Sequence, residues 1–123
     1  MRKEKTKLMK KLEKLVKDYV RRRDNYTCQW CGKCVTGSNC HVSHVIPVSA
    51  GGAFRFDPLN MKVLCYHCHL NVWHKDPIGA QKWFSEKFPE RYEYLFDRSQ
   101  NDRLKKWTDF ELEEEIKKFT NLI

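Results

Sequence analysis

Two Cys-x-x-Cys pairs constrain the fold of this 123-residue chain more than any other feature. They are Cys28-Gln-Trp-Cys31 and Cys65-Tyr-His-Cys68. Each pair can present two thiolates to one ion, and four thiolates complete the closed tetrahedral site that is typical of structural zinc. Because 33 residues lie between Cys31 and Cys65, we expect the ion to join the two ends of an intervening subdomain.

The other two cysteines leave the ligand set open. Cys34 lies three residues after Cys31 and could replace Cys28 or Cys31, although we favour Cys28 and Cys31 as ligands. Without a ligand role, Cys34 and Cys40 are expected to be small buried residues. A different hypothesis is a single Cys2His2-type site made of Cys65, Cys68, His69 and His74.

The six cysteines could instead form three disulfides, but the start of the chain argues against this. Met1-Arg-Lys-Glu is followed by charged residues rather than by the apolar run of an export signal. No apolar stretch is long enough to cross a bilayer. We therefore expect a cytoplasmic location, reduced cysteines that bind metal, and no membrane partner.

Positive charge is concentrated at the N-terminus. The formal net charge is +8, and Met1–Thr27 holds 11 Lys and Arg against 4 Asp and Glu, so this segment carries all but one of the net charges. Such an arm favours a polyanionic partner such as DNA. The best candidates for phosphate contacts in it are Arg21, Arg22 and Arg23.

An amphipathic helix is predicted from about Glu4 to Arg23, because this segment lacks Gly and Pro. Its apolar residues recur at helical spacing, and the stripe could pack on the rest of the domain or form a homodimer with a second copy. The stripe consists of Leu8, Leu12, Leu15 and Tyr19, widened by Met9, Val16 and Val20.

The rest of the chain predicts a mixed α+β fold. Strands are expected over Cys40–Val48 and Met61–Leu64, and a helix from about Cys68 to Lys75. The Asp76-Pro77 pair predicts a helix to about Phe88, and Pro89 begins another. Thr108 and Glu111 fit a capping box for a final helix that ends near Thr120. Loops are expected at 28–40 and 50–53 and a turn at 57–60.

These residues together resemble the HNH endonucleases that have a four-cysteine zinc site. The resemblance runs from about Arg21 to His74 and rests on the order of several short motifs: Arg23-Asp-Asn-Tyr-Thr-Cys28-Gln-Trp-Cys31-Gly, Ser43-His44-Val-Ile-Pro47, Gly51-Gly52, Asp57-Pro-Leu-Asn60 and Leu64-Cys65-Tyr-His-Cys68-His69. Residues 55–94 further look like the small phage-type members. The resemblance implies a zinc-stapled ββα-metal finger at 25–76, flanked by a basic helix at 1–24 and a helical extension at 77–123, all in one nuclease domain.

The resemblance also implies roles for three residues. His44 would be the general base that activates water, Asn60 would hold the loop between the strands, and His69 would bind a catalytic divalent cation such as Mg²⁺ or Mn²⁺. The chemistry is reasonable, because hydrolysis of a DNA phosphodiester needs a base near neutral pKa and a cation that neutralises charge on phosphorus.

The chain departs from the family pattern at Ser43, where many members have an acidic or His ligand. His41 shares a strand face with Ser43 and has a longer reach, so we favour His41 as the second ligand, with Ser43 and water as the alternative. His74 is expected to turn away from His69, since five residues correspond to about 140° around an α-helix. Arg55 is a further candidate for phosphate contact.

Several aromatic residues are more simply explained as core than as base-stacking platforms. They are Trp30, Trp73, Trp83, Phe84, Tyr92 and Phe96. The runner-up function is a non-catalytic zinc module that binds DNA through the basic helix. The resemblance to small phage-type members also suggests a phage-encoded protein with phage DNA-processing partners in a bacterial host.

Overall fold

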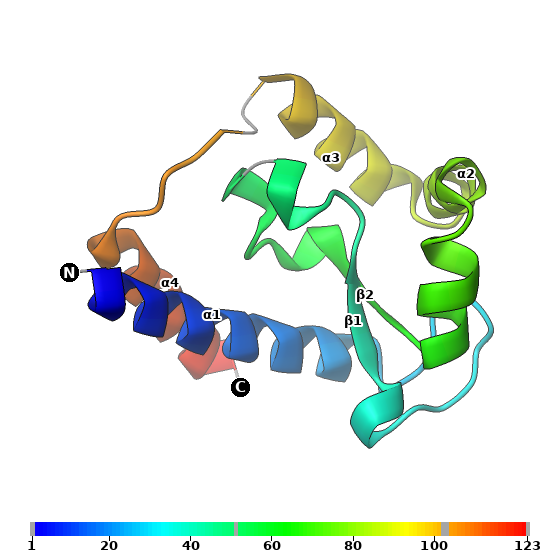
Figure 1. Cartoon of the computed structure of the whole chain (residues 1–123), viewed down its shortest axis with the longest axis horizontal. Coiled ribbons are helices and arrows are strands. Elements are labelled where there is room, and N and C mark those ends of the chain that lie inside the picture. Colours follow the sequence, from blue (N-terminus) through cyan, green and yellow to red (C-terminus); the bar gives the residue numbers. More distant parts are fainter. Residues whose placement is uncertain (1, 51, 102–103, 123) are drawn as a thin grey trace.

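The computed structural model describes residues 2–50, 52–101 and 104–122. The fold is mixed α+β, as predicted, with a two-stranded hairpin between two pairs of helices (Figure 1). The strands are β1 (His41–His44) and β2 (Met61–Leu64), and the helices are α1 (Arg2–Arg23), α2 (Pro77–Lys87), α3 (Pro89–Asn101) and α4 (Asp109–Leu122). None of the described helices is both long and apolar enough to span a membrane.

The hairpin is antiparallel, with Ser43 opposite Lys62 and His44 opposite Met61. β1 is shorter than the predicted strand over Cys40–Val48 and ends at His44. The reason lies in Asn60, whose side-chain oxygen accepts the Ile46 N–H at 2.8 Å. This side chain takes the place of a strand partner, so the chain leaves the ladder directly after His44.

α1 packs its apolar stripe against α4 of the same chain. Leu12, Val16 and Val20 are fully buried, and the rings of Tyr19 and Phe119 meet edge to face with centroids 5.6 Å apart. α1 and α4 lie side by side in Figure 1. Of the two partners that were open for the stripe, α4 covers it, so a second copy of the chain is not needed to bury it.

The predicted caps of the later helices are confirmed. The Asp76 side chain accepts the Gly79 N–H at 3.0 Å at the start of α2. Before α4, the Thr108 N–H donates to the Glu111 carboxylate at 3.1 Å, and the Glu111 N–H donates to the Thr108 hydroxyl at 3.2 Å. This reciprocal pair is the capping box.

A clamp of two charged residues fastens the end of α1 to the hairpin. The buried Asp24 carboxylate accepts the Val63 N–H at 2.8 Å and pairs with Arg23 at 2.9 Å. The Arg23 guanidinium also donates to the carbonyls of Pro58 at 2.6 Å and Met61 at 2.7 Å. Arg23, which we predicted to contact DNA, thus donates to the Asp24 carboxylate and to two backbone carbonyls of the protein itself.

Candidate functional site

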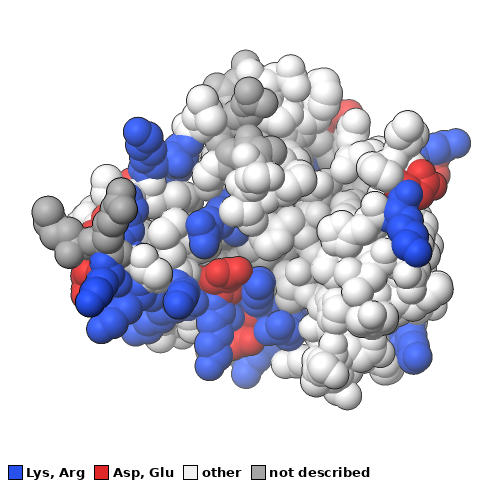
Figure 2. All heavy atoms as spheres, viewed as in Figure 1, with Lys and Arg blue, Asp and Glu red and all other residues white. Residues whose placement is uncertain are grey.

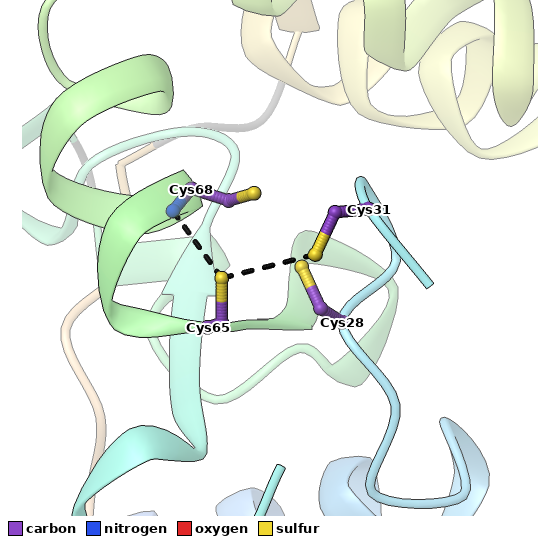
Figure 3. A group of neighbouring side chains, drawn as sticks. All are labelled: Cys28, Cys31, Cys65 and Cys68. Carbon is purple, nitrogen blue, oxygen red and sulfur yellow. Dashed lines mark hydrogen bonds between the residues drawn. The ribbon is translucent and has the colours of Figure 1, made fainter. Parts of the chain in front are cut away.

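The first part of the site is a cluster of four cysteines, which lies where the Cys28–Cys31 knuckle meets the segment after β2 (Figure 3). Their sulfur atoms all lie within 4.8 Å of one another, and the Cys31 and Cys65 sulfurs are 3.9 Å apart. A tetrahedral zinc ion with Zn–S bonds of about 2.3 Å separates its sulfurs by about 3.8 Å. The cluster therefore fits a four-thiolate metal site.

The electrostatics of the cluster point the same way. Burial raises the pKa of Cys28, but backbone N–H groups of Cys31, Cys65 and Trp30 outweigh it and bring the pKa to about 7. The pKa of Cys68 is raised by burial and by the neighbouring Cys65 and Cys28 thiols. The Cys28 thiol thus ionises readily, whereas the Cys68 thiol does not. Several thiolates repel one another at this distance unless a cation lies between them.

Residues considered as alternative ligands lie outside the cluster. Within the described chain, the only group of metal-binding side chains whose ligand atoms converge is Cys28, Cys31, Cys65 and Cys68. Cys40 is buried, as expected, but Cys34 is exposed, so its prediction as a buried residue is wrong. Cys34 instead lies in an isolated bridge with Thr27 at the mouth of the knuckle.

The second part of the site is a pocket of about 460 Å³ beside the end of β1, lined by His44, His69 and His74 among others. The Nε2 atom of His44 is buried and has no hydrogen-bond partner among the described residues. Buried polar atoms normally have a partner. The pKa of His44 is lowered, chiefly by burial and then by the positive charge of Lys17.

The prediction that His74 turns away from His69 is wrong. Cys68–Trp73 is a π-helix, in which the His74 N–H donates to the His69 carbonyl at 3.1 Å. Hydrogen bonds over five residues widen the turn, so positions i and i+5 share a face. The Nε2 atoms of the two imidazoles are 3.0 Å apart. π-turns of this kind occur frequently at functional sites.

His41, His69 and His74 form a chain of imidazoles whose tautomers follow from their partners. The Ser38 carbonyl accepts from His41 Nε2 at 2.9 Å, so neutral His41 presents the lone pair of Nδ1 to His69 Nδ1 at 3.0 Å. His69 then donates through Nδ1, and the lone pair of its Nε2 is directed at His74. Metal-binding histidines are typically oriented in this way, with the second nitrogen donating to a fixed acceptor.

This arrangement distinguishes the two neighbours of His69. His41 contacts His69 Nδ1 and does not line the pocket, whereas His74 contacts His69 Nε2 and lines the pocket together with His44. Burial, followed by the charges of the adjacent His74 and His41, lowers the pKa of His69 to about 4. A neutral imidazole is the form that can bind a cation.

Asn60 is fully buried and spans the loop between the strands. Its side-chain amide donates to the carbonyls of Ile46 at 2.9 Å and Phe54 at 3.2 Å, in addition to accepting the Ile46 N–H. The Asn60 carbonyl accepts the Val45 N–H at 2.8 Å. Three of these four bonds hold the backbone directly after His44, and the fourth fixes the loop at Phe54.

Sequence reasoning missed Lys62, which is fully buried on β2 opposite Ser43. Its ammonium donates to the Ser43 hydroxyl at 3.1 Å and lies 3.3 Å from the centre of the Trp73 ring. Burial, followed by the charge of Arg91, holds the pKa of Lys62 well below its usual value. The sequence could have indicated this pair only if the strand register, which places Lys62 opposite Ser43, had been known.

Replacing Lys62 with methionine is expected to stabilise the protein. None of the ion pairs among the described residues includes Lys62, and Asp24 acts on its charge more weakly than burial and Arg91 do. Lys62→Met therefore removes a costly buried amine and keeps a side chain of similar length on Trp73. We expect a gain of about 1 kcal/mol in the free energy of unfolding. Urea unfolding measures it. Ser43→Ala is the matched variant, and it should instead destabilise by about 1 to 3 kcal/mol because it removes the acceptor. A loss of stability in Lys62→Met would contradict this account.

The arginines that we predicted to contact phosphates differ in their exposure and in their partners within the protein. Arg22 is exposed, whereas Arg21 pairs with Asp18 at 3.0 Å. Arg55 is partly buried, and its guanidinium lies 5.4 Å from the Phe56 ring centre. The aromatic residues predicted to be core are buried or half-buried except Phe96, which is 52% exposed on α3.

A hairpin followed by a helical turn, stapled by four cysteines, defines the class of ββα metal fingers. Residues 28–82 match the HNH endonuclease family, and the chain therefore contains a domain of this family over that range. The matched range extends past the predicted finger end at residue 76 into α2. Searches among curated proteins and among solved structures found no match to the chain.

Proposed function

We propose that this protein is a metal-dependent endonuclease that hydrolyses DNA phosphodiester bonds. The observation that carries the proposal is the buried, unpartnered Nε2 of His44 in a pocket that it shares with His69 and His74. A base with an unpartnered ring nitrogen, beside a pocket that is also lined by imidazoles that can bind a cation, has the parts that phosphodiester hydrolysis needs. The HNH family match supports the same chemistry.

We assign a structural role to the four-cysteine cluster. Zn²⁺ suits its sulfur donors, and Cys28, Cys31, Cys65 and Cys68 would leave no open position for substrate. The ion would join the knuckle after α1 to the segment after β2. It would thereby hold the ends of the finger that carries His44 and His69.

A second, catalytic cation would be held in the pocket by His69 through Nε2. Of its neighbours, the hydrogen bonds favour His74 as the partner ligand and His41 as the residue that orients His69, in place of our first preference for His41 as ligand. Ser43 is a poorer ligand, because the Lys62 ammonium already holds its hydroxyl. Such a cation would neutralise charge on the phosphate and on the leaving 3′ oxygen.

The chain's own residues perform the remaining tasks. His44 accepts the proton of the attacking water at Nε2, which a neutral imidazole can do. Asn60 keeps the backbone after His44 in place through its hydrogen bonds to Val45 and Ile46. Arg22 and Arg55 are candidates for contact with flanking phosphates.

Nicking of supercoiled plasmid by the zinc-loaded protein tests the proposal. Because imidazole ligands suit Mn²⁺ and Ni²⁺ better than Mg²⁺, we expect cleavage to be faster with Mn²⁺ or Ni²⁺. The products should end in 5′-phosphates, as in the family that the chain resembles, which ligation of the nicks by DNA ligase will show. Intact plasmid with every cation, under conditions where the protein binds DNA, would contradict the proposal.

The pH dependence of cleavage follows from the lowered pKa of His44. The base works in its neutral form, so a pKa below the usual 6.5 leaves it active at mildly acidic pH. We expect single-turnover rates to rise with pH below about 6.5 and to be constant from there to about 8. Zinc content, measured at each pH, controls for loss of the structural ion. A midpoint above 6.5 would contradict His44 as a desolvated base.

The second candidate is a zinc-dependent DNA-binding module without catalysis, and the Ser43–Lys62 pair favours it. That pair puts a buried amine where many family members place a metal ligand. Metal titration separates the two functions, because only the nuclease needs a cation beyond the zinc. The division at residues 24 and 76, the cytoplasmic location, and the phage origin with its processing partners stay predictions.

A further inference from the structure

α1 carries a row of six cations along the side opposite its buried stripe. Their spacing alternates between four and three residues, which keeps them on one face over about 27 Å of helix. Figure 2 shows Lys and Arg gathered along α1, with few Asp and Glu among them. The row consists of Lys3, Lys7, Lys10, Lys14, Lys17 and Arg21.

The row is unfavourable for the isolated protein. Like charges three and four residues apart on a helix repel each other. Within the described chain, only the two C-terminal members of the row form ion pairs that offset this repulsion. Lys17 pairs with Glu13 and Arg21 pairs with Asp18, each at 3.0 Å. A helix that needed only solubility would alternate the signs of its charges along this face.

The C-terminal end of the row approaches the candidate active site. A shallow cleft of about 360 Å³ is lined by Lys10, Glu13, Lys14, Lys17 and Arg21. α1 contacts both strands of the hairpin, and Lys17 is near enough to His44 to act on its charge. A polyanion lying along the row would therefore come near His44 at its Lys17 end.

We propose that this row is a phosphate track that binds the backbone of duplex DNA and leads it toward His44. The proposal rests on the proposed function for the choice of DNA as the polyanion. An anionic membrane fits less well, because a helix that binds membranes inserts its apolar face, and here Leu12, Val16 and Val20 are fully buried under the fold. The contacts would be to phosphates and independent of base sequence.

The test compares two double variants that remove the same charge from exposed lysines. Lys7→Gln/Lys14→Gln lies on the row, and Lys11→Gln/Lys117→Gln lies off it. Fluorescence anisotropy with a short duplex measures affinity at about 50 to 200 mM salt, without added catalytic cation. We expect the row variant to bind at least about tenfold more weakly and to lose about 2 from the slope of log affinity against log salt. The other variant should change the affinity less than about twofold.

Equal weakening in both variants would overturn the track, since net charge alone would then explain binding. Unchanged binding by the row variant would overturn it as well. Anionic phospholipid vesicles serve as the competing probe, and row-dependent binding to them that exceeds binding to the duplex would reassign the surface. Because cleavage is not measured, these results are independent of whether His44 acts as a base. Thermal unfolding verifies that both variants are folded.

Discussion

Cys65→Ser is expected to abolish the folded state of the finger. The apparent free energy with which four thiolates hold zinc is on the order of 10 kcal/mol or more, comparable with the whole stability of a small domain. The cluster also joins segments that are 33 residues apart in the sequence. We therefore expect loss of zinc, loss of the near-ultraviolet circular dichroism signal and disappearance of the cooperative thermal transition.

The matched control is Cys34→Ser, which changes an exposed cysteine outside the cluster. It should retain one zinc ion per chain and unfold at the temperature of the unchanged protein. A chelator such as EDTA should reproduce the effect of Cys65→Ser in the unchanged protein. Full zinc content and a normal transition in Cys65→Ser would show that the cluster is not the metal site.

His44→Ala is expected to lower the rate of DNA cleavage by about 10² to 10⁴, the usual contribution of a general base. The loss should appear in the single-turnover rate constant, while DNA affinity measured without added cation stays within about twofold, because His44 is not among the residues that we propose to hold phosphates. The assay is nicking of supercoiled plasmid at saturating protein.

The control variant is His67→Ala, which removes an exposed histidine between two cluster cysteines and should cleave at the normal rate. Circular dichroism and zinc content establish that His44→Ala is folded. Equal cleavage by His44→Ala and the unchanged protein would remove His44 from the mechanism. Loss of cleavage in His67→Ala as well would point to damage of the finger rather than to lost chemistry.

Local patterns predicted the elements well where a few neighbouring residues decide them. Asp76-Pro77 and the Thr108–Glu111 box marked helix starts that the structure confirms. The apolar stripe of α1 predicted which face is buried, but periodicity has no information about the partner, which is α4. The strand after Cys40 was predicted too long, because one distant side chain, Asn60, ends it.

The candidate site divides in the same way. The four cysteines could be chosen from spacing, because two short knuckles with one metal geometry leave few alternatives. The position of His74 could not be predicted, because we assumed an α-helix. The wider turn of the π-helix instead brings the His74 side chain to the same face as His69. Arg23 and Lys62 could not be assigned either, because their partners are 35 and 19 residues away.

By itself, the sequence determined the cysteine staple, the basic α1 and the order of motifs that carries His44, Asn60 and His69. Only the tertiary structure decided that His74 rather than His41 shares the pocket with His44, and that Lys62 holds Ser43. The physical reason is the distance along the sequence between the interacting residues. Caps, stripes and metal knuckles are set by neighbouring residues, whereas the tautomer of His69 and the burial of Lys62 depend on groups that only folding brings together.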